Sequence, residues 1–365
     1  MSVKWAVKGF LEDLDYYIKG IPRFLFVWKD DREMSLDTFF IENVKKYPDD
    51  VAFIFNDEKI TWLEADKQID RYAALLQSKD ISKDQSFALL MDNSPDFLML
   101  FIAANRIGAI AALINTTVTG EGLKHVISIS ESKAVICGAS HLEKLKKSIE
   151  GSDLIDIPIL LTKDSEDVPT GYDDIVIESK SHENPSKVKV KLIETAAYIF
   201  TSGTTGLPKA ALVDHAKLVK GSYAGQFFGF NFKHEDIFYL TLPLYHSTGL
   251  LYGWGASLRA GCATIIKPKF SASEFWPDIK KHKATAFVYV GELLRYLMNN
   301  PASSSDKDHN IRVISGNGLR PDIWDSFQKR FGVSKIVEMY GACLLYTSDA
   351  ADDSLRVDLG GRRII

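Results

Sequence analysis

Residues 198–210 read Tyr-Ile-Phe-Thr-Ser-Gly-Thr-Thr-Gly-Leu-Pro-Lys-Ala. An apolar strand predicted over residues 196–200 leads here into a loop of glycines and hydroxyl side chains. Glycines let the backbone approach a ligand, and their N–H groups can ring phosphate oxygens, while hydroxyls add donors and lysine adds a compact positive charge. We therefore predict a phosphate-binding loop. Its members are Thr201, Ser202, Gly203, Thr204, Thr205, Gly206 and Lys209.

The loop does not have the spacing of the P-loop found in kinases and GTPases, which requires G-x-x-x-x-G-K-[ST]. Gly203 and Gly206 are three positions apart, and Leu-Pro separates Gly206 from Lys209. The alternative interpretation is a surface turn with one solvated lysine. A string with three fixed classes of residue rarely arises from turn chemistry alone, which favours phosphate binding.

The flanking sequence alternates between helical and strand patterns, which predicts an α/β fold with layered, mostly parallel sheets flanked by helices. Ser94 and Pro95 are expected to cap one helix, and residues 271–274 to form a capping box that opens another. We predict helices over residues 37–46, 64–77, 120–130 and 141–149, and strands over residues 51–55, 59–62, 86–91 and 134–137. The first two strands are expected to form a hairpin around Asn56-Asp57-Glu58.

Two further segments carry candidate site residues. Tyr245 and His246 follow an apolar strand, although a histidine in that setting is, by itself, more often a satisfied core residue. Gly316-Asn317-Gly318 ends another strand, where bare backbone and one amide can face a flat heterocycle. Asparagine suits adenine because it both donates and accepts hydrogen bonds. A plain strand-to-helix turn is the alternative for this second segment.

With these motifs the chain resembles the AMP-forming acyl-adenylate synthetases, and within them the fatty acid transport protein / very-long-chain acyl-CoA synthetase branch. The resemblance covers about residues 35–342 and rests on the strings at 113–117, 242–247, 270–276, 289–293 and 316–322. It implies the large N-terminal domain of that fold. It also implies that ATP, Mg²⁺ and coenzyme A serve to convert a long or very long fatty acid to its acyl-adenylate and then its CoA ester, coupled to fatty acid uptake.

The resemblance also implies roles for single residues. Lys209 and His246 would be catalytic, and the phosphate loop together with Gly316, Asn317 and Gly318 would hold ATP or AMP. Tyr340 would stack on the adenine. The substrate pocket would be bordered by Tyr245, His246 and Gly291.

After Ala342 the chain departs from the family, which continues with a Thr-Glu pair whose carboxylate helps to hold the metal. Residues 343–365 match nothing in the family and resemble a translated sequencing adapter. We therefore predict no metal ligand in this chain and an adenylation domain that stops before the small C-terminal domain. We also expect negligible turnover from the 365 residues alone.

The remaining expectations concern partners and location. The net charge of −4 argues against nucleic acid as a partner, and three widely spaced cysteines argue for a reducing compartment. Residues 1–34 form an amphipathic pattern that predicts either a helix at a membrane surface or a helix packed on its own domain. A helix at a membrane surface would place the protein on the cytosolic face of the endoplasmic reticulum or plasma membrane. The other functions considered are a non-catalytic lipid-binding or transport protein, and an adenylating enzyme for another acid.

Overall fold

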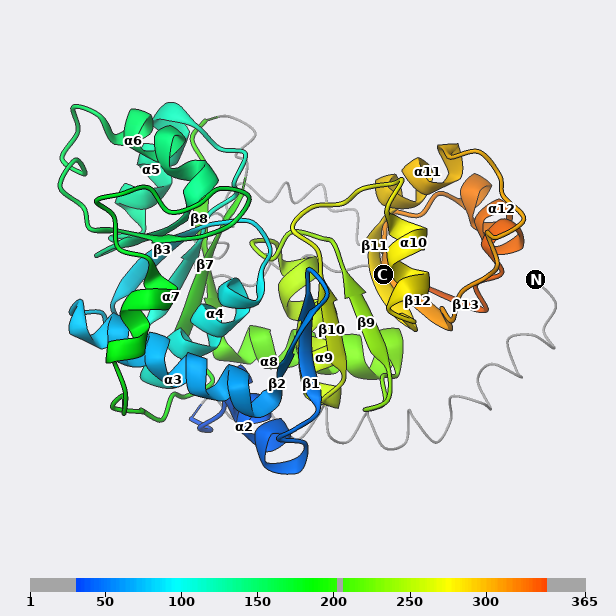
Figure 1. The fold of residues 1–365 in the computed structure, drawn as a ribbon, viewed down its shortest axis with the longest axis horizontal. Helices are drawn as coiled ribbons and strands as arrows, with labels where there is room; N and C mark the ends of the chain where they lie inside the picture. The colour runs from blue at the N-terminus through cyan, green and yellow to red at the C-terminus, as the bar shows by residue number, and fades with distance from the viewer. Residues whose placement is uncertain (1–30, 202–205, 340–365) are drawn as a thin grey trace, which may run out of the picture.

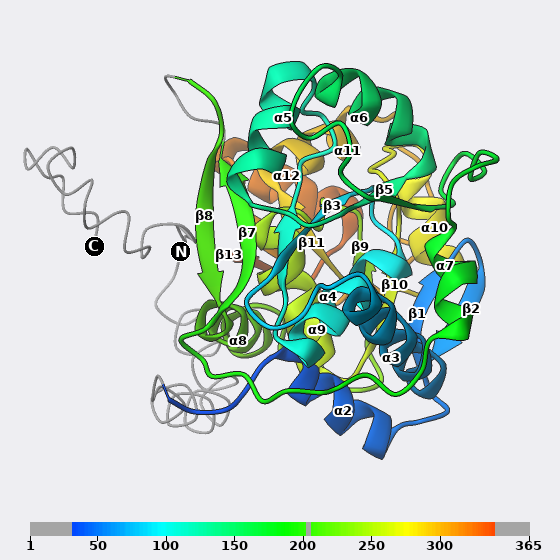
Figure 2. The same cartoon turned by 90° about the vertical axis from the view of Figure 1, so that its left-hand side faces the viewer.

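The computed structural model describes residues 31–201 and 206–339, and within these ranges the strands form two sheets. The first sheet has six strands in the order β6-β5-β3-β4-β7-β8, all parallel except β8. Figure 2 shows β7 and β8 side by side at its edge. The bounds are β3 Ser86–Leu90, β4 Ile110–Leu113, β5 Val135–Gly138, β6 Ile159–Thr162, β7 Thr195–Thr201 and β8 Lys209–Asp214.

The second sheet has seven strands among the described residues, in the order β13-β12-β11-β9-β10-β1-β2. Only β2 is antiparallel to its neighbour. It follows β1 through a turn at Asn56 and Asp57, both with positive φ, as the predicted hairpin requires. The bounds are β1 Val51–Phe55, β2 Glu58–Thr61, β9 Ile237–Leu240, β10 Ala263–Ile266, β11 Ala286–Val290, β12 Val313–Asn317 and β13 Lys335–Glu338.

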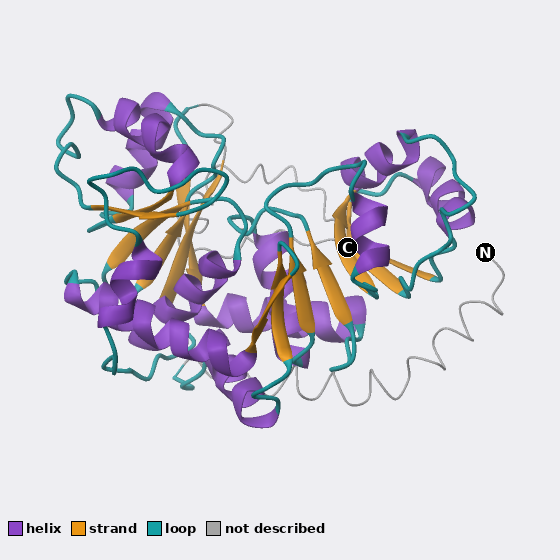
Figure 3. Cartoon of the chain, viewed as in Figure 1, coloured by secondary structure: helices purple, strands orange, loops and turns teal. Residues whose placement is uncertain are grey.

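Helices fill the space between the sheets and cover their outer faces (Figures 1 and 3). Helices α2, α3, α4, α8 and α9 pack against one another in the middle layer, α5 and α6 cover the six-stranded sheet, and α10 to α12 lie against the seven-stranded sheet. Their bounds are α2 Leu36–Lys46, α3 Trp62–Ser78, α4 Pro95–Ile107, α5 Gly120–Ile129, α6 Leu142–Ile149, α7 Ile175–Glu178, α8 His215–Ala224, α9 Gly255–Ala260, α10 Phe275–Lys281, α11 Gly291–Asn299 and α12 Pro321–Phe331. Short 3₁₀ turns η1 Ala139–His141 and η2 Ser179–Ser181 and two π-helices, η3 Gly225–Phe230 and η4 Thr248–Trp254, complete the description. The sheet order confirms the predicted layered, mostly parallel α/β fold.

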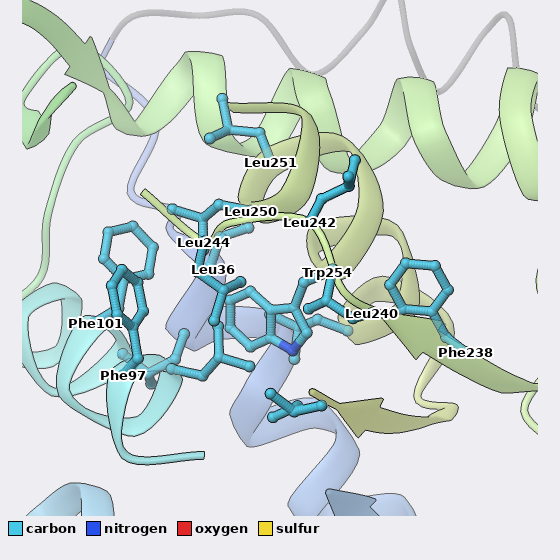
Figure 4. Close-up of a cluster of buried hydrophobic side chains, with 14 of the residues drawn as sticks. Leu36, Phe97, Phe101, Phe238, Leu240, Leu242, Leu244, Leu250, Leu251 and Trp254 are labelled. Atoms are coloured by element: carbon cyan, nitrogen blue, oxygen red, sulfur yellow. The ribbon is translucent and has the colours of Figure 1, made fainter. Parts of the chain in front are cut away.

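The main core lies in the middle layer and includes Leu36, Phe97 and Trp254, all nearly inaccessible to solvent (Figure 4). One charge is buried beside it. The guanidinium of Arg106 has no exposed side-chain surface and pairs at 2.7 Å with each of three carboxylates. These carboxylates belong to Asp37, Asp66 and Asp70. Since α2, α3 and α4 supply the four groups, the cluster ties three helices of the layer together.

Helix capping shows where local sequence rules hold. Ser94 caps α4 by accepting a hydrogen bond from the Phe97 amide at 3.2 Å, with Pro95 in the first turn, as predicted. The capping box predicted over residues 271–274 is wrong. The residue before α10 is Glu274, which already has helical backbone angles and whose side chain caps no amide. Ser271 instead lies within 3.3 Å of Ser273 through its hydroxyl, outside the helix.

Candidate active site

The phosphate loop predicted from the sequence connects β7 to β8, and β8 is an edge strand of the six-stranded sheet. Strands β7 and β8 are antiparallel, and Thr201 lies directly opposite Lys209 in their register. Lys209 is exposed at the start of β8, and a side chain added at Gly206 would meet no atom within 4 Å. The two ends of the loop are therefore held in the sheet next to β4. The other predicted members, Ser202, Gly203, Thr204 and Thr205, lie outside the described residues.

An apolar pocket of about 310 Å³ lies where strands of both sheets end. The segments that follow β3, β4, β9, β10 and β11 all contribute to its wall. Tyr245, Phe270, Leu293 and Tyr296 supply apolar surface. In parallel α/β sheets, ligands bind beyond the carboxyl ends of the strands, so the position of this pocket is that of a ligand site.

Tyr245 and His246 lie at this edge because the preceding chain is anchored in the core. Leu240, Leu242 and Leu244 alternate along the chain, and Figure 4 shows them within the buried cluster around Trp254. Past this anchor, the rings of Tyr245 and His246 make an edge-to-face contact with centroids 4.7 Å apart.

The two rings differ in their surroundings. Tyr245 is half-buried in the pocket wall, and this burial raises the pKa of its hydroxyl. His246 is exposed, yet neighbouring protein removes part of its hydration and lowers its pKa. The neutral imidazole is therefore the favoured form near pH 7. Gly249 follows three residues after His246, and a Cβ there would lie 2.5 Å from the carbonyl oxygen of Pro243.

Three glycines predicted in the site lie where the backbone at the end of β11 closely approaches the backbone at the end of β12. A Cβ at Gly291 would lie 1.8 Å from the carbonyl oxygen of Gly318, and a Cβ at Gly316 would lie 2.0 Å from that of Tyr289. Gly318 has a φ of +77°, a conformation that glycine adopts without strain. The end of β12, which also carries Asn317, thus presents backbone without side chains beside the start of α11.

Glu338, at the end of β13, holds this glycine segment in position. Its carboxylate accepts a hydrogen bond from the Tyr289 hydroxyl at 2.6 Å and another from the Leu319 amide at 3.1 Å. Burial and the neighbouring carboxylate raise the pKa of Tyr289 well above its usual range. The Met339 amide donates to the carbonyl oxygen of Gly316 at 2.7 Å. Tyr340, the predicted adenine-stacking residue, follows in the sequence and lies outside the described residues.

Sequence reasoning gave no role to the side chains that join these parts. Tyr289 lies within a string used for the resemblance and Glu338 lies two positions before Tyr340, but the hydrogen bond between them joins positions 49 apart. Asn93 joins β3 to the segments after β9 and β10. It immediately precedes the helix-capping Ser94, and its neighbours in the sequence give no sign of these long-range contacts. Its neighbour Asp92 pairs with Lys269 at 3.1 Å on the pocket rim. Although burial opposes the effect, hydrogen bonds from His141 and Lys269 lower the pKa of Asp92.

Residues 31–201 and 206–339 contain no group of three or more His, Cys, Asp or Glu side chains that could hold a metal ion. We therefore assign no ligand to Mg²⁺. Cys137 and Cys262 are buried free thiols, and burial raises the pKa of each to about 12. Within the same ranges, no helix combines the length and apolar character that a membrane crossing requires.

Comparison with known proteins identifies the class to which this fold and site belong. The fold matches that of acid–CoA ligases in solved structures. The inhibitor-bound N-terminal domain of FACL13 from Mycobacterium tuberculosis has a TM-score of 0.74 at 22% identity, covering 89% of this chain and 80% of that one. A benzoate CoA ligase from Burkholderia xenovorans LB400 has a TM-score of 0.75 at 17% identity, covering 86% and 62%.

The chain belongs to the AMP-binding enzyme family, whose sequence profile matches residues 40–343. It is 36% identical over 343 residues to mouse long-chain fatty acid transport protein 6, covering 91% of this chain and 54% of the relative. It is 33% identical over 332 residues to the medium/long-chain-fatty-acid–CoA ligase FadD6 of Mycobacterium tuberculosis, with the same coverage. These relatives confirm the resemblance drawn from the motifs. The chain spans about half the length of the curated relatives that it matches.

Proposed function

We propose that the protein activates a long or very long fatty acid with ATP and transfers the acyl group to coenzyme A. The observation that carries this proposal is the apolar pocket beside Tyr245, at the same edge of the sheets as the ends of the Thr201–Lys209 loop. An acid with an apolar tail would be accommodated in such a pocket, with its carboxylate toward the loop. The names of the relatives support fatty acid as the substrate class.

In the first step, a carboxylate oxygen forms a bond to the α-phosphorus of ATP. The bond from that phosphorus to the bridging oxygen breaks, and pyrophosphate leaves. Two anions must approach each other, so Lys209 and the donors of the loop would neutralise charge on the triphosphate. Backbone at Gly316 and Gly318 would lie against the adenine, and Asn317 would supply an amide to its edge.

In the second step, the thiol of coenzyme A attacks the acyl carbon, AMP leaves, and the thiol proton passes to a base or to water. Tyr245, His246 and Gly291 would border the reacting carboxyl group; Gly291 lies in the chain between Val290 and Glu292, which line the pocket. A neutral imidazole is suited to this position because it adds no competing positive charge. Mg²⁺, which would accompany ATP, supplies charge neutralisation when bound.

We also propose that the reaction is coupled to uptake at the cytosolic side of a membrane, because esterification traps the acid as a charged CoA ester. Residues 1–34 would provide the membrane contact through their amphipathic pattern. Residues 1–30 lie outside the described part of the chain. Sedimentation with liposomes tests this contact, and equal binding by a variant without residues 1–34 would contradict it.

The decisive experiment is fatty-acid-dependent ATP–pyrophosphate exchange by the full-length protein, with acids from C8 to C24. We expect exchange that favours long chains, and a loss on the order of 10²–10³ in rate for Lys209→Met. Lys124→Met, on the exposed side of α5, serves as the matched control. Acid binding without exchange would instead indicate a lipid-binding protein, and exchange only with aromatic or short acids would indicate a different substrate.

A further inference from the structure

Asn93 connects the two sheets at the edge of the apolar pocket. It follows β3, and only 4% of its surface is exposed. Its Nδ2 donates to the carbonyl oxygens of Leu242 at 2.9 Å and Lys267 at 3.2 Å. Its Oδ1 accepts from the Leu244 amide at 2.8 Å. One side chain of the six-stranded sheet thus binds the segments after two strands of the other sheet, at sequence separations of 149 to 174 residues.

A carboxamide is required for this set of contacts. Two donors and one acceptor are engaged, and all of the partners are backbone groups. Ionised aspartate can accept a hydrogen bond but cannot donate one. Leucine has a similar volume but can neither donate nor accept a hydrogen bond. A carboxylate at position 93 would also face two carbonyl oxygens. The hydrogen-bond geometry at position 93 therefore favours asparagine over aspartate and leucine, although side chains of similar volume would fill the same space.

Two of the contacts lie just before the residues that border the candidate carboxylate position. Asn93 is hydrogen-bonded to the backbone on both sides of Pro243, and the second of these partners, Leu244, directly precedes Tyr245. Burial of Leu242 and Leu244 holds this segment in the core, but apolar packing does not set the rotation of individual peptide groups. Hydrogen bonds do set it, because they are directional.

We propose that Asn93 is a positioning residue for the acyl substrate: it fixes the peptide groups at residues 242–244 and thereby the rings of Tyr245 and His246. This role rests on the proposed function, since it concerns how that site receives its acid. Asn93 itself is not assigned a contact with the reacting atoms. The nucleotide loop connects to a different strand, so its position does not depend on this asparagine.

Asn43 provides a matched control elsewhere in the fold. It is 5% exposed, and its Nδ2 donates at 2.6 Å to the carbonyl oxygen of Leu258, joining α2 to α9. Its loss removes a buried, long-range carboxamide contact without touching the pocket wall. Asn43→Leu therefore accounts for any general loss of stability in Asn93→Leu. Asn93→Asp is the second variant, because it retains the acceptor and the volume.

The first measurement is the KM for acid and for ATP in pyrophosphate exchange by the full-length protein. We expect Asn93→Leu to raise the KM for the acid at least about tenfold and to leave the KM for ATP within about twofold, since three directional hydrogen bonds at the edge of the pocket are lost. Asn93→Asp should also raise the KM for the acid, and Asn43→Leu should change neither the KM for the acid nor the KM for ATP. Equal KM values for the Asn93 and Asn43 variants, or a parallel rise for ATP, would overturn the proposal.

The second measurement needs no activity and uses the 365-residue chain. Hydrogen exchange of the Leu244 amide should become at least about tenfold faster in Asn93→Leu and remain unchanged in Asn43→Leu. An unchanged rate in Asn93→Leu would refute the positioning role directly. If the unmodified full-length protein showed no acid-dependent ATP–pyrophosphate exchange, the proposed function would be refuted instead. The hydrogen-exchange rates of the Leu244 amide would still decide whether Asn93 fixes this segment.

Discussion

The tight contact between Gly291 and Gly318 allows a quantitative test of the candidate site. In Gly291→Ala the new Cβ would stand 1.8 Å from the carbonyl oxygen of Gly318, about 1.2 Å short of the 3.0 Å that real Cβ contacts require. The obstructing atom is a backbone oxygen, which cannot turn aside as the end of a flexible side chain can. The two segments must therefore separate by more than 1 Å.

A displacement of this size is expected to cost about 10²-fold in kcat/KM and about 1–3 kcal/mol of stability. Gly122→Ala is the matched control, because it makes the same change within helix α5, where the added methyl group meets only a side-chain carbon of Val118 at 3.1 Å. Pyrophosphate exchange measures the activity, and urea unfolding measures the stability. Activity of Gly291→Ala within twofold of the unmodified protein would refute the idea that this contact shapes the site.

Three further perturbations test other parts of the molecule. His215 is 1% exposed, and burial lowers its pKa to about 4, so below pH 6.5 the unfolded chain binds a proton that the folded chain does not bind. The free energy of unfolding should therefore fall by ~3 kcal/mol between pH 6.5 and 4, and urea unfolding of His215→Gln should lack this pH dependence. Arg106→Leu should destabilise the fold by about 3–5 kcal/mol, because it leaves three carboxylates around an apolar side chain; thermal unfolding within 2 °C of the unmodified protein would contradict this. Tyr289→Phe removes the hydroxyl that donates to Glu338, and we expect the KM for ATP to rise about tenfold in pyrophosphate exchange while the KM for the acid stays within about twofold.

Sequence alone predicted the parts of the fold that local chemistry decides. Ser94 and Pro95 began a helix, and Asn56-Asp57 made a hairpin turn, because each outcome depends on a few neighbouring residues. The error at residues 271–274 has the same origin. A serine three positions before a glutamate fits the capping pattern, but the chain there places Glu274 itself at the helix start.

The π-helices could not be anticipated in this way. A Cβ at Gly225 would lie 2.2 Å from the carbonyl oxygen of Tyr252, and one at Gly229 would lie 2.2 Å from the hydroxyl of the same tyrosine. That hydroxyl also lies 2.5 Å from the Ser315 hydroxyl. The widened helical turns η3 and η4 therefore accompany contacts between segments distant in sequence, to which a local pattern gives no access.

For the site, the sequence indicated the residue types that meet ligands but not those that hold them in place. Glycines, Lys209 and His246 stand out in local strings. Asn93 and the pair Tyr289–Glu338 become recognisable only when the ends of several strands are brought together. Such residues have ordinary neighbours, so no motif marks them.

The pairing of Thr201 with Lys209 has a consequence for how this site can diversify. The lysine belongs to the sheet, and its main-chain position follows from the register of two strands. Exchanges of residue type within residues 202–208 that keep the length of this connection therefore leave the cation in its place. A lineage could vary the sequence that meets the triphosphate and retain one fixed charge beside it. Grafting loops of the same length from distant relatives between positions 201 and 209 is, by the same reasoning, a workable route to altered nucleotide preference.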